Sequence, residues 1–332
     1  MTKTALVIGA TGGIGGEMAK ALVKRGWRVK ALNRKPQEAA LNHSRLGPIE
    51  WVEGDAMNAA DVARAAEGVS ILFHGANPPA YRNWEGLAVP MLANSIAAAK
   101  AAGARLLFPG TIYNFGPDAW SCLSELSPQH PLTRKGAIRV RMETMIKEAT
   151  RDGMKALIVR AGDFFGGTGG NNWFNAGLVK PGKALRSVTY PGLREAGHSW
   201  AYLPDLAETF ARLIEIEDQL ADFERFHFEG HWFARGVEMA EAIRRVAGNP
   251  DLPIRRFPWP IVYLASPFVN MFHEMLEMRY LWREPLHLDN RKLVSRLGAE
   301  PHTPTDEAVR ASLQMLNCVP EPEVWFTRHA AA

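Results

Sequence analysis

The sequence predicts an α/β protein with a doubly wound parallel sheet of the Rossmann type and a smaller, partly interleaved C-terminal lobe. Short apolar runs alternate with helical patterns through the first half of the chain. Glycines spaced three residues apart follow the first of these runs, and the composition changes after Ala161. With 332 residues, 47% of them hydrophobic and 22% charged, the chain is long enough to bury a substantial core.

The predicted strands of the first half are short and apolar. We expect them at 4–8, 28–32, 49–52, 71–73, 105–108 and 156–159. Helices are expected between several of them, at 61–66, at 89–102 and before Gly26, which supplies a left-handed helix stop. This alternation is typical of parallel strands joined by crossover helices.

Two domains are expected: a dinucleotide-binding domain over residues 1–165 and a substrate-binding lobe over 166–332. The lobe begins with loops rich in Gly, Asn and Pro, which suit ligand binding above the carboxyl ends of the strands. A helix at 204–215 and a strand at 224–228 are expected to return to the sheet. Asp205 is interpreted as the N-cap of that helix, with Glu208 completing a capping box.

Charge and composition narrow the classes of partner. The net charge of +4 is modest and the basic residues are spread along the chain, which argues against nucleic-acid binding and favours a small anionic ligand. No apolar run approaches the roughly 20 residues that span a bilayer, and no signal peptide is recognised, so a cytoplasmic location is expected. Cys122 and Cys318 lack a CxxC spacing, so we expect neither a metal site nor a disulfide framework.

The most apolar segment of the chain is 257–272, directly after Arg255 and Arg256. It is too short to cross a membrane. A buried helix or a subunit contact is the favoured interpretation, and contact with a lipid surface is the alternative.

The segment VIGATGGIGGEMAKAL predicts a phosphate-binding loop between a strand and an amphipathic helix. The first glycine lets the chain turn, the second lets the backbone approach a pyrophosphate, and the third lets the helix pack closely on the strand. The N-terminus of the helix then offers free amide groups to the phosphates. The expected contacts in this loop are Gly9, Thr11, Gly12, Gly13, Ile14 and Gly15.

The end of the second strand indicates which dinucleotide is bound. Proteins that bind NAD usually place Asp or Glu there, whereas this chain has Asn33, Arg34 and Lys35. Arg34 can pair with a 2′-phosphate, so NADP(H) is preferred and NAD(H) remains possible. The alternative is a solvated basic loop. After the third strand, Asp55 and Ala56 are placed to contact the adenine, although Asp55 could equally be an N-cap.

The sequence resembles the extended short-chain dehydrogenase/reductase family, which includes NAD-dependent epimerases and dehydratases. The resemblance rests on TGGIGG, GDAMNAADVARAAEGVSILFHGAN, LFPGTIYNFGP, VRAGDFFGG and SWAYLPDLAETF, which occur in this order and cover most of the chain to about residue 213. It implies that His74, Gly75 and Ala76 line the cofactor. It also implies a homodimer formed through the helices around Ser95 and Arg141.

The catalytic residues of this family are only partly present. By resemblance, Thr111 stands where the family has a Ser or Thr, but the Tyr-x-x-x-Lys pair is replaced by Lys135 and Arg139. Arg139 can still hold the ribose, yet its pKa above about 12 rules it out as a proton donor at neutral pH.

Three replacements for the missing tyrosine are considered. Lys135 could act as the acid if burial and its cationic neighbours, Arg134 and Arg139, lower its pKa. Tyr113 is favoured, because strand alternation would place it on the same face as Thr111; core packing is its alternative role. Asp163 and His198, from the substrate loops, are the third possibility.

The expected substrate-binding residues lie on both sides of the glycine-rich stretch in the sequence. Asn171, Asn172 and Trp173, together with Trp200, are expected to form a hydrogen-bonding wall. The remaining candidates are Asn77, Asp163 and His198. Arg160 ends a buried strand and is expected to pair with a carboxylate or a ligand.

The sequence therefore predicts an NADP(H)-dependent oxidoreductase or epimerase-like enzyme that acts on a small carbonyl or hydroxyl compound. A non-catalytic NADP(H)-sensing protein is the second hypothesis, because the tyrosine is missing. A subunit-interaction protein that keeps the cofactor as a structural element is the third.

Overall fold

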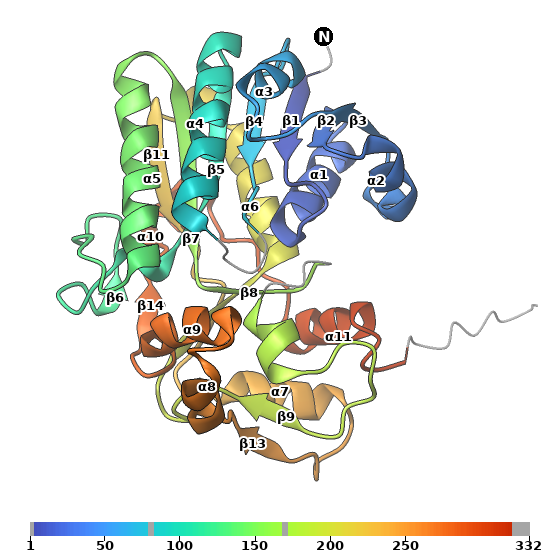
Figure 1. Cartoon of the computed structure of the whole chain (residues 1–332), viewed down its shortest axis with the longest axis vertical. Helices are drawn as coiled ribbons and strands as arrows, with labels where there is room; N and C mark the ends of the chain where they lie inside the picture. Colours follow the sequence, from blue (N-terminus) through green and yellow to red (C-terminus); the bar gives the residue numbers. More distant parts are fainter. Residues whose placement is uncertain (1–2, 79–82, 168–171, 321–332) are drawn as a thin grey trace, which may run out of the picture.

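The computed structural model describes residues 3–78, 83–167 and 172–320. Its upper half contains a parallel seven-stranded sheet with the strand order β11-β7-β5-β4-β1-β2-β3 (Figure 1). The strands are β1 (Thr4–Ile8), β2 (Arg28–Asn33), β3 (Ile49–Glu53), β4 (Ile71–His74), β5 (Arg105–Thr111), β7 (Lys155–Ala161) and β11 (Phe223–His227). The apolar side chains of the inner strands are buried on both faces, as expected of a parallel sheet covered by helices, and those of the edge strand β3 are half-buried.

Helices cover both faces of this sheet. One face packs against α1 (Gly13–Lys24) and α6 (Leu203–Glu215), and the other packs against α3 (Ala59–Ala65), α4 (Trp84–Ala102) and α5 (Arg134–Arg151). The short α2 (Pro36–Asn42) lies beside β3. The strand order reverses between β1 and β4, and ligands of such sheets bind at the carboxyl ends of the strands on either side of this point. The predicted fold class is therefore confirmed.

The lower half is a separate layer of small sheets and helices (Figure 1). Its strands are β8 (Asp163–Phe165), β10 (His198–Tyr202) and β12 (His231–Phe233), then β9 (Val188–Tyr190) with β13 (Ile254–Arg256), and β14 (Leu286–Leu288) with β6 (Ser121–Leu123). Its helices are α7 (Glu238–Val246), α8 (Trp259–Ala265), α9 (Asn270–Glu277) and α11 (Thr305–Met315), whereas α10 (Arg291–Leu297) packs against β11 in the upper half. Short helical turns η3 (Ile112–Asn114), η4 (Phe174–Leu178) and η6 (Arg279–Trp282) complete the connections discussed below. Its core contains several tryptophans, Trp200 and Trp282 among them.

The chain passes between the halves more than once. After β10, α6 packs against α1 and β11 pairs in parallel with β7, so both elements lie in the upper half. The interpretation of Asp205 as an N-cap is wrong, because α6 begins at Leu203 and the Asp205 carboxylate instead accepts hydrogen bonds from Thr303 N and Oγ1, both at 2.7 Å. Asp205 thus ties α6 to the segment before α11.

In the apolar segment 257–272, the buried helix of the favoured interpretation is not found, while the subunit contact stays a prediction. It forms α8, a turn and the start of α9, and several of its large side chains are exposed rather than buried. The expectation of a buried helix is therefore wrong for this segment. Among the described helices, none combines the length and apolar character that crossing a membrane requires.

Candidate dinucleotide and substrate site

The loop between β1 and α1 has room for backbone only. Gly9 has a φ of +89°, and a Cβ added to it would lie 2.7 Å from the carbonyl carbon of Gly75. A Cβ on Gly15 would lie 2.2 Å from the Gly9 carbonyl oxygen, so the helix and the strand approach too closely for any side chain. Gly12 is the N-cap of α1 and provides no side-chain cap. The first amide groups of α1 thus remain for an anionic ligand, as a dinucleotide pyrophosphate requires.

At the end of β2, the chain presents a cation. Asn33 Oδ1 accepts a hydrogen bond from Lys35 N at 2.8 Å, which shapes the turn, and Lys35 pairs with Glu38. Arg34 is exposed and forms no ion pair with a carboxylate of the described residues. Asp55 is not an N-cap, because Asn58 caps α3. Its Oδ1 accepts from Met57 N at 2.9 Å, and the half-buried carboxylate lies beside the same edge of the sheet.

His74, at the end of β4, is held as a neutral ring. Its Nδ1 lies 2.7 Å from Ser95 Oγ, and its side chain is buried. Burial and the positive charge of Arg139 lower the pKa of His74 to about 3. The Arg139 guanidinium itself stacks on the rings of Trp84 and Phe108, 4.9 and 5.4 Å from their centroids. Arg139, His74 and Gly75 thus lie together beside the glycine loop.

Asn77 lies at the edge of this group. Its Oδ1 accepts a hydrogen bond from Trp84 Nε1, so the amide is oriented by the same tryptophan that supports Arg139. Ala76 precedes it, in direct reach of Gly9.

Lys135, at the position where the family has tyrosine, is surrounded by carboxylates. Its Nζ lies 2.6 Å from Glu274 Oε2 and 3.2 Å from Glu277 Oε2, and its side chain is 1% exposed. Lys135 Nζ also donates to the Glu274 carbonyl at 2.8 Å, and Arg134 pairs with Glu274. The expected cationic surroundings are therefore wrong. Two carboxylates of α9 form ion pairs with Lys135 and tie α9 to the first turn of α5.

Thr111 and Tyr113 lie beside that turn, but strand alternation does not relate them. Strand β5 ends at Thr111, and η3 follows, with Thr111 Oγ1 accepting from Tyr113 N at 3.3 Å. A Cβ on Gly136 would lie 2.3 Å from the Tyr113 carbonyl oxygen, so η3 touches α5. Thr111, Tyr113, Lys135 and Arg139 are thus brought to one place, with Tyr113 half-buried.

On the substrate side, Asp163 and His198 form a buried pair. His198 Nε2 lies 2.9 Å from Asp163 Oδ2, and its ring stacks on Trp282 with centroids 4.1 Å apart. Trp173 packs against the same Trp282 at 5.1 Å. Trp200 is fully buried behind these rings.

The amide groups expected in the substrate wall are only partly described. Asn172 Oδ1 accepts from Asn175 N at 2.8 Å, which joins it to the first turn of η4. Asn171 lies outside the described residues.

Comparisons with known proteins agree with this geometry. Residues 9–172 match the protein-family model described as NAD(P)H-binding. The N-terminal half is an NAD(P)H-binding domain. A search of curated proteins finds no match to the chain.

The NAD(P)H-binding domain and its lobe together have the fold of solved epimerases. UDP-glucose 4-epimerase from Bifidobacterium longum, solved with NAD+ and UDP, is 16% identical, with 95% of this chain and 98% of that chain covered and a TM-score of 0.71. UDP-glucuronic acid 4-epimerase from Bacillus cereus, solved with UDP-glucuronic acid and NAD, is 13% identical, with 95% of this chain and 99% of that chain covered and a TM-score of 0.72. The enzyme WbmH from Bordetella bronchiseptica, solved with NAD+, is 18% identical, with 96% of this chain and 99% of that chain covered and a TM-score of 0.68. These likenesses show that the chain shares the fold of those enzymes, which is the fold that the resemblance to extended short-chain dehydrogenases/reductases implies.

One residue beside the NAD(P)H-binding domain was missed by sequence reasoning. Tyr280, in η6, stacks on Trp120 with centroids 5.8 Å apart, and its hydroxyl has no hydrogen-bond partner among the described residues. Burial and the negative charges of Asp163 and Glu277 raise its pKa, so the phenol stays protonated. No local motif marks Tyr280, because its neighbours come from distant parts of the chain.

Arg160, at the end of β7, forms the ion pair that was one of its two expected roles. Its Nε donates to Glu143 Oε1 at 3.0 Å, and Nη1 lies 3.2 Å from His227 Nε2. This buried group fixes α5 against β7 and β11 rather than facing a ligand.

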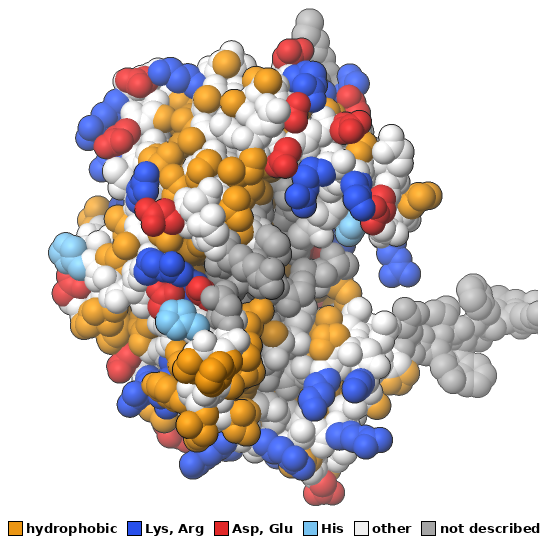
Figure 2. Space-filling view, in the orientation of Figure 1, with side chains coloured by type: hydrophobic (Ala, Val, Ile, Leu, Met, Phe, Trp, Pro, Cys, Tyr) orange, Lys and Arg blue, Asp and Glu red, His pale blue; other side chains and the backbone are white. Residues whose placement is uncertain are grey.

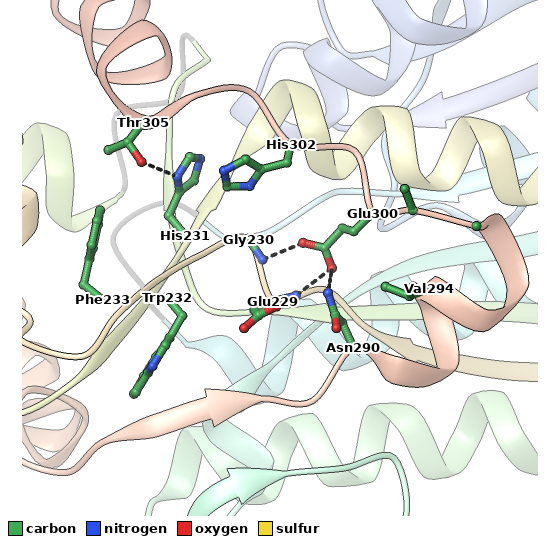
Figure 3. Close-up of a pocket in the computed structure, with 12 residues that line it drawn as sticks. Glu229, Gly230, His231, Trp232, Phe233, Asn290, Val294, Glu300, His302 and Thr305 are labelled. Carbon is green, nitrogen blue, oxygen red and sulfur yellow. Dashed lines mark hydrogen bonds between the residues drawn. The ribbon is translucent and has the colours of Figure 1, made fainter.

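A separate pocket of about 550 Å³ lies between β12 and α10, and no residue of the glycine loop lines it (Figure 3). Glu300 points inward there and accepts from the backbone N–H groups of Glu229 and Gly230 and from Asn290 Nδ2. His231 Nδ1 lies 3.1 Å from Thr305 Oγ1, and burial with the nearby His302 lowers the pKa of His231 to about 4. These contacts hold the turn after β11 against α11.

Proposed function

We propose that this protein is an NADP(H)-dependent oxidoreductase or epimerase-like enzyme that acts on a small carbonyl or hydroxyl compound. The observation that carries the proposal is the glycine loop with Arg34 beside it. No carboxylate stands at the end of β2 to accept from ribose hydroxyls, and the Arg34 guanidinium is exposed without an ion-pair partner among the described residues. A 2′-phosphate supplies the missing anion.

The cofactor preference is tested with Arg34→Asp. The variant should bind NADPH at least about tenfold more weakly, because it loses a charge-assisted contact and gains a repulsive carboxylate, while NADH affinity changes little. Arg28→Asp is the matched control, since Arg28 is exposed at the opposite end of β2 and pairs with Glu50. Fluorescence titration of each variant with both dinucleotides measures the difference, and equal losses for NADPH and NADH would contradict the assignment.

The residues around Lys135 suggest how the reaction is supported. When bound, the dinucleotide supplies the hydride chemistry. Arg139 holds the ribose, and the Thr111 hydroxyl orients the substrate oxygen. The reaction also needs a proton donor, and the proposed candidates are two phenols that pack against one hydrophobic cluster: Tyr113, beside Thr111, and Tyr280, whose hydroxyl has no hydrogen-bond partner among the described residues.

The two phenols are distinguished by Tyr113→Phe and Tyr280→Phe. Removing the true donor should slow single-turnover oxidation of bound NADPH by about 100-fold or more and leave NADPH affinity unchanged. Tyr263→Phe, in the exposed part of α8, is the control. The oxidants are a panel of aldehydes, ketones and quinones, and UDP-sugars belong in the same panel because the similar solved structures include UDP-sugar epimerases. If neither substitution slows the reaction, neither phenol is the proton donor.

The second candidate is a protein that senses NADP(H) without turnover. The surroundings of Lys135 favour it. Lys135 stands where the family has its tyrosine, and its ammonium group is already engaged in ion pairs with Glu274 and Glu277. Tight NADPH binding with no oxidation by any member of the panel supports this reading. A homodimer through α4 and α5 is also proposed, and sedimentation velocity tests it.

A further inference from the structure

An apolar surface lies on the lower lobe, at the turn between α8 and α9. We define the apolar tip as Ile261, Tyr263, Leu264, Phe268, Val269 and Met271, all exposed. Leu264 is 79% exposed and Phe268 is 89% exposed. Figure 2 shows hydrophobic side chains gathered where Figure 1 draws α8 and α9. A contiguous patch of this kind marks a contact surface.

A cationic rim adjoins the apolar tip. Lys180, Lys183 and Arg186 line a groove of about 790 Å³ together with Phe257 and Pro258, which lead directly into α8. Arg255 and Arg256 lie on β13, which pairs with β9 beside the same groove. The five cations of this rim are exposed.

The rim lacks counter-charges. None of its five cations forms an ion pair with a carboxylate within residues 3–78, 83–167 and 172–320, whereas Arg28 and Arg245 elsewhere on the surface pair with Glu50 and Asp306. Over the stretches 172–194 and 250–273, which supply the tip and the rim, Asp251 is the only acidic residue of the sequence. A partner that fits this surface would therefore carry negative charge beside an apolar region.

We propose that the apolar tip and its cationic rim dock on an anionic lipid surface. Helices α8 and α9 have seven and eight residues, so they lie in the interface and do not span it. Acyl chains accept Leu264 and Phe268, and lipid phosphates neutralise the rim. A second copy of the chain fits less well, because a twofold contact through the tip would bring two unneutralised rims together.

This inference is independent of the proposed reaction. The apolar tip is made of exposed side chains, while the Glu274 and Glu277 carboxylates of α9 point to Lys135. Substitutions in the tip can therefore be checked by NADPH titration, which reports whether the protein remains folded.

The test is co-sedimentation of the full chain with vesicles. We expect binding to phosphatidylcholine vesicles that contain phosphatidylglycerol, weak binding to phosphatidylcholine alone, and release by salt. The double variant Leu264→Glu/Phe268→Glu should lose binding. Each rim cation replaced by Gln, for example Lys183→Gln, should weaken binding about fivefold. Leu126→Glu is the matched control, because Leu126 is 92% exposed outside the tip.

Three outcomes overturn the proposal. The first is absence of wild-type binding to the anionic vesicles. The second is unchanged binding by the double variant, with Leu126→Glu as the reference. The third is a dimer in sedimentation velocity that the double variant dissociates without any vesicle binding, which assigns the tip to a second copy of the chain.

Discussion

The glycine loop and the Lys135 pocket, formed by Lys135, Glu274 and Glu277, both belong to the proposed site but are built in different ways. The loop is fixed by backbone packing: Gly9, Gly15 and Gly75 leave no room for a Cβ. The pocket is fixed by charge: Lys135 is buried between Glu274 and Glu277. The first arrangement fails when atoms are added, and the second fails when a charge is removed. Substitutions in each place should therefore separate binding from stability.

The largest effect on stability is expected for Lys135→Met. It leaves the buried Glu274 carboxylate and the half-buried Glu277 carboxylate without their ammonium partner, which should lower the free energy of unfolding by about 3–5 kcal/mol. Urea denaturation measures it. Lys100→Met is the control, because Lys100 forms an exposed pair with Asp152 and its loss should cost under about 1 kcal/mol. A Lys135 variant as stable as the control would show that the pocket does not depend on the ion pair.

Gly15→Ala should act mainly on binding. Its Cβ would lie 2.2 Å from the Gly9 carbonyl oxygen, so α1 must shift away from β1, at a cost of about 1–3 kcal/mol. The displaced amide groups should abolish NADPH binding. Gly26→Ala is the control: φ is +74° but no heavy atom lies within 4 Å of its Cβ, so only backbone strain of about 1–2 kcal/mol is added. Full NADPH affinity in Gly15→Ala would contradict this role for the loop.

The same difference explains what the sequence could predict. The loop, the parallel strands and the cation at Arg34 follow from local spacing, and the structure contains the expected strands and the glycine-rich turn between β1 and α1. The Lys135 pocket could not be predicted, because its partners lie 139 residues or more away and depend on how α9 packs. Tyr280 was missed for the same reason. Asp205 matched a local capping pattern, yet Thr303 from a distant segment takes its carboxylate.

The smallest effect is a pH dependence shared by the two halves. The pKa of His227 is lowered to about 3 by burial and the charge of Arg160, that of His74 is also about 3, and that of His231 is about 4. The unfolded chain, with histidine pKa values near 6.5, binds more protons than the folded chain, so stability falls as the pH drops below about 6.5. From pH 7 to pH 6 each ring should cost about 0.7 kcal/mol.

His227→Gln separates one ring from the other two. His227 Nδ1 donates to the Leu123 carbonyl and Nε2 accepts from Arg160, and glutamine can donate and accept in the same place without titrating. Urea denaturation of the protein without added dinucleotide at pH 7 and pH 6 should therefore show about one third less acid destabilisation in the variant. The matched control is His130→Gln, which removes an exposed ring. An identical pH dependence in His227→Gln and in the wild type would mean that His227 is already protonated in the fold, and that Arg160 is neutralised by Glu143 well enough to tolerate a second buried cation.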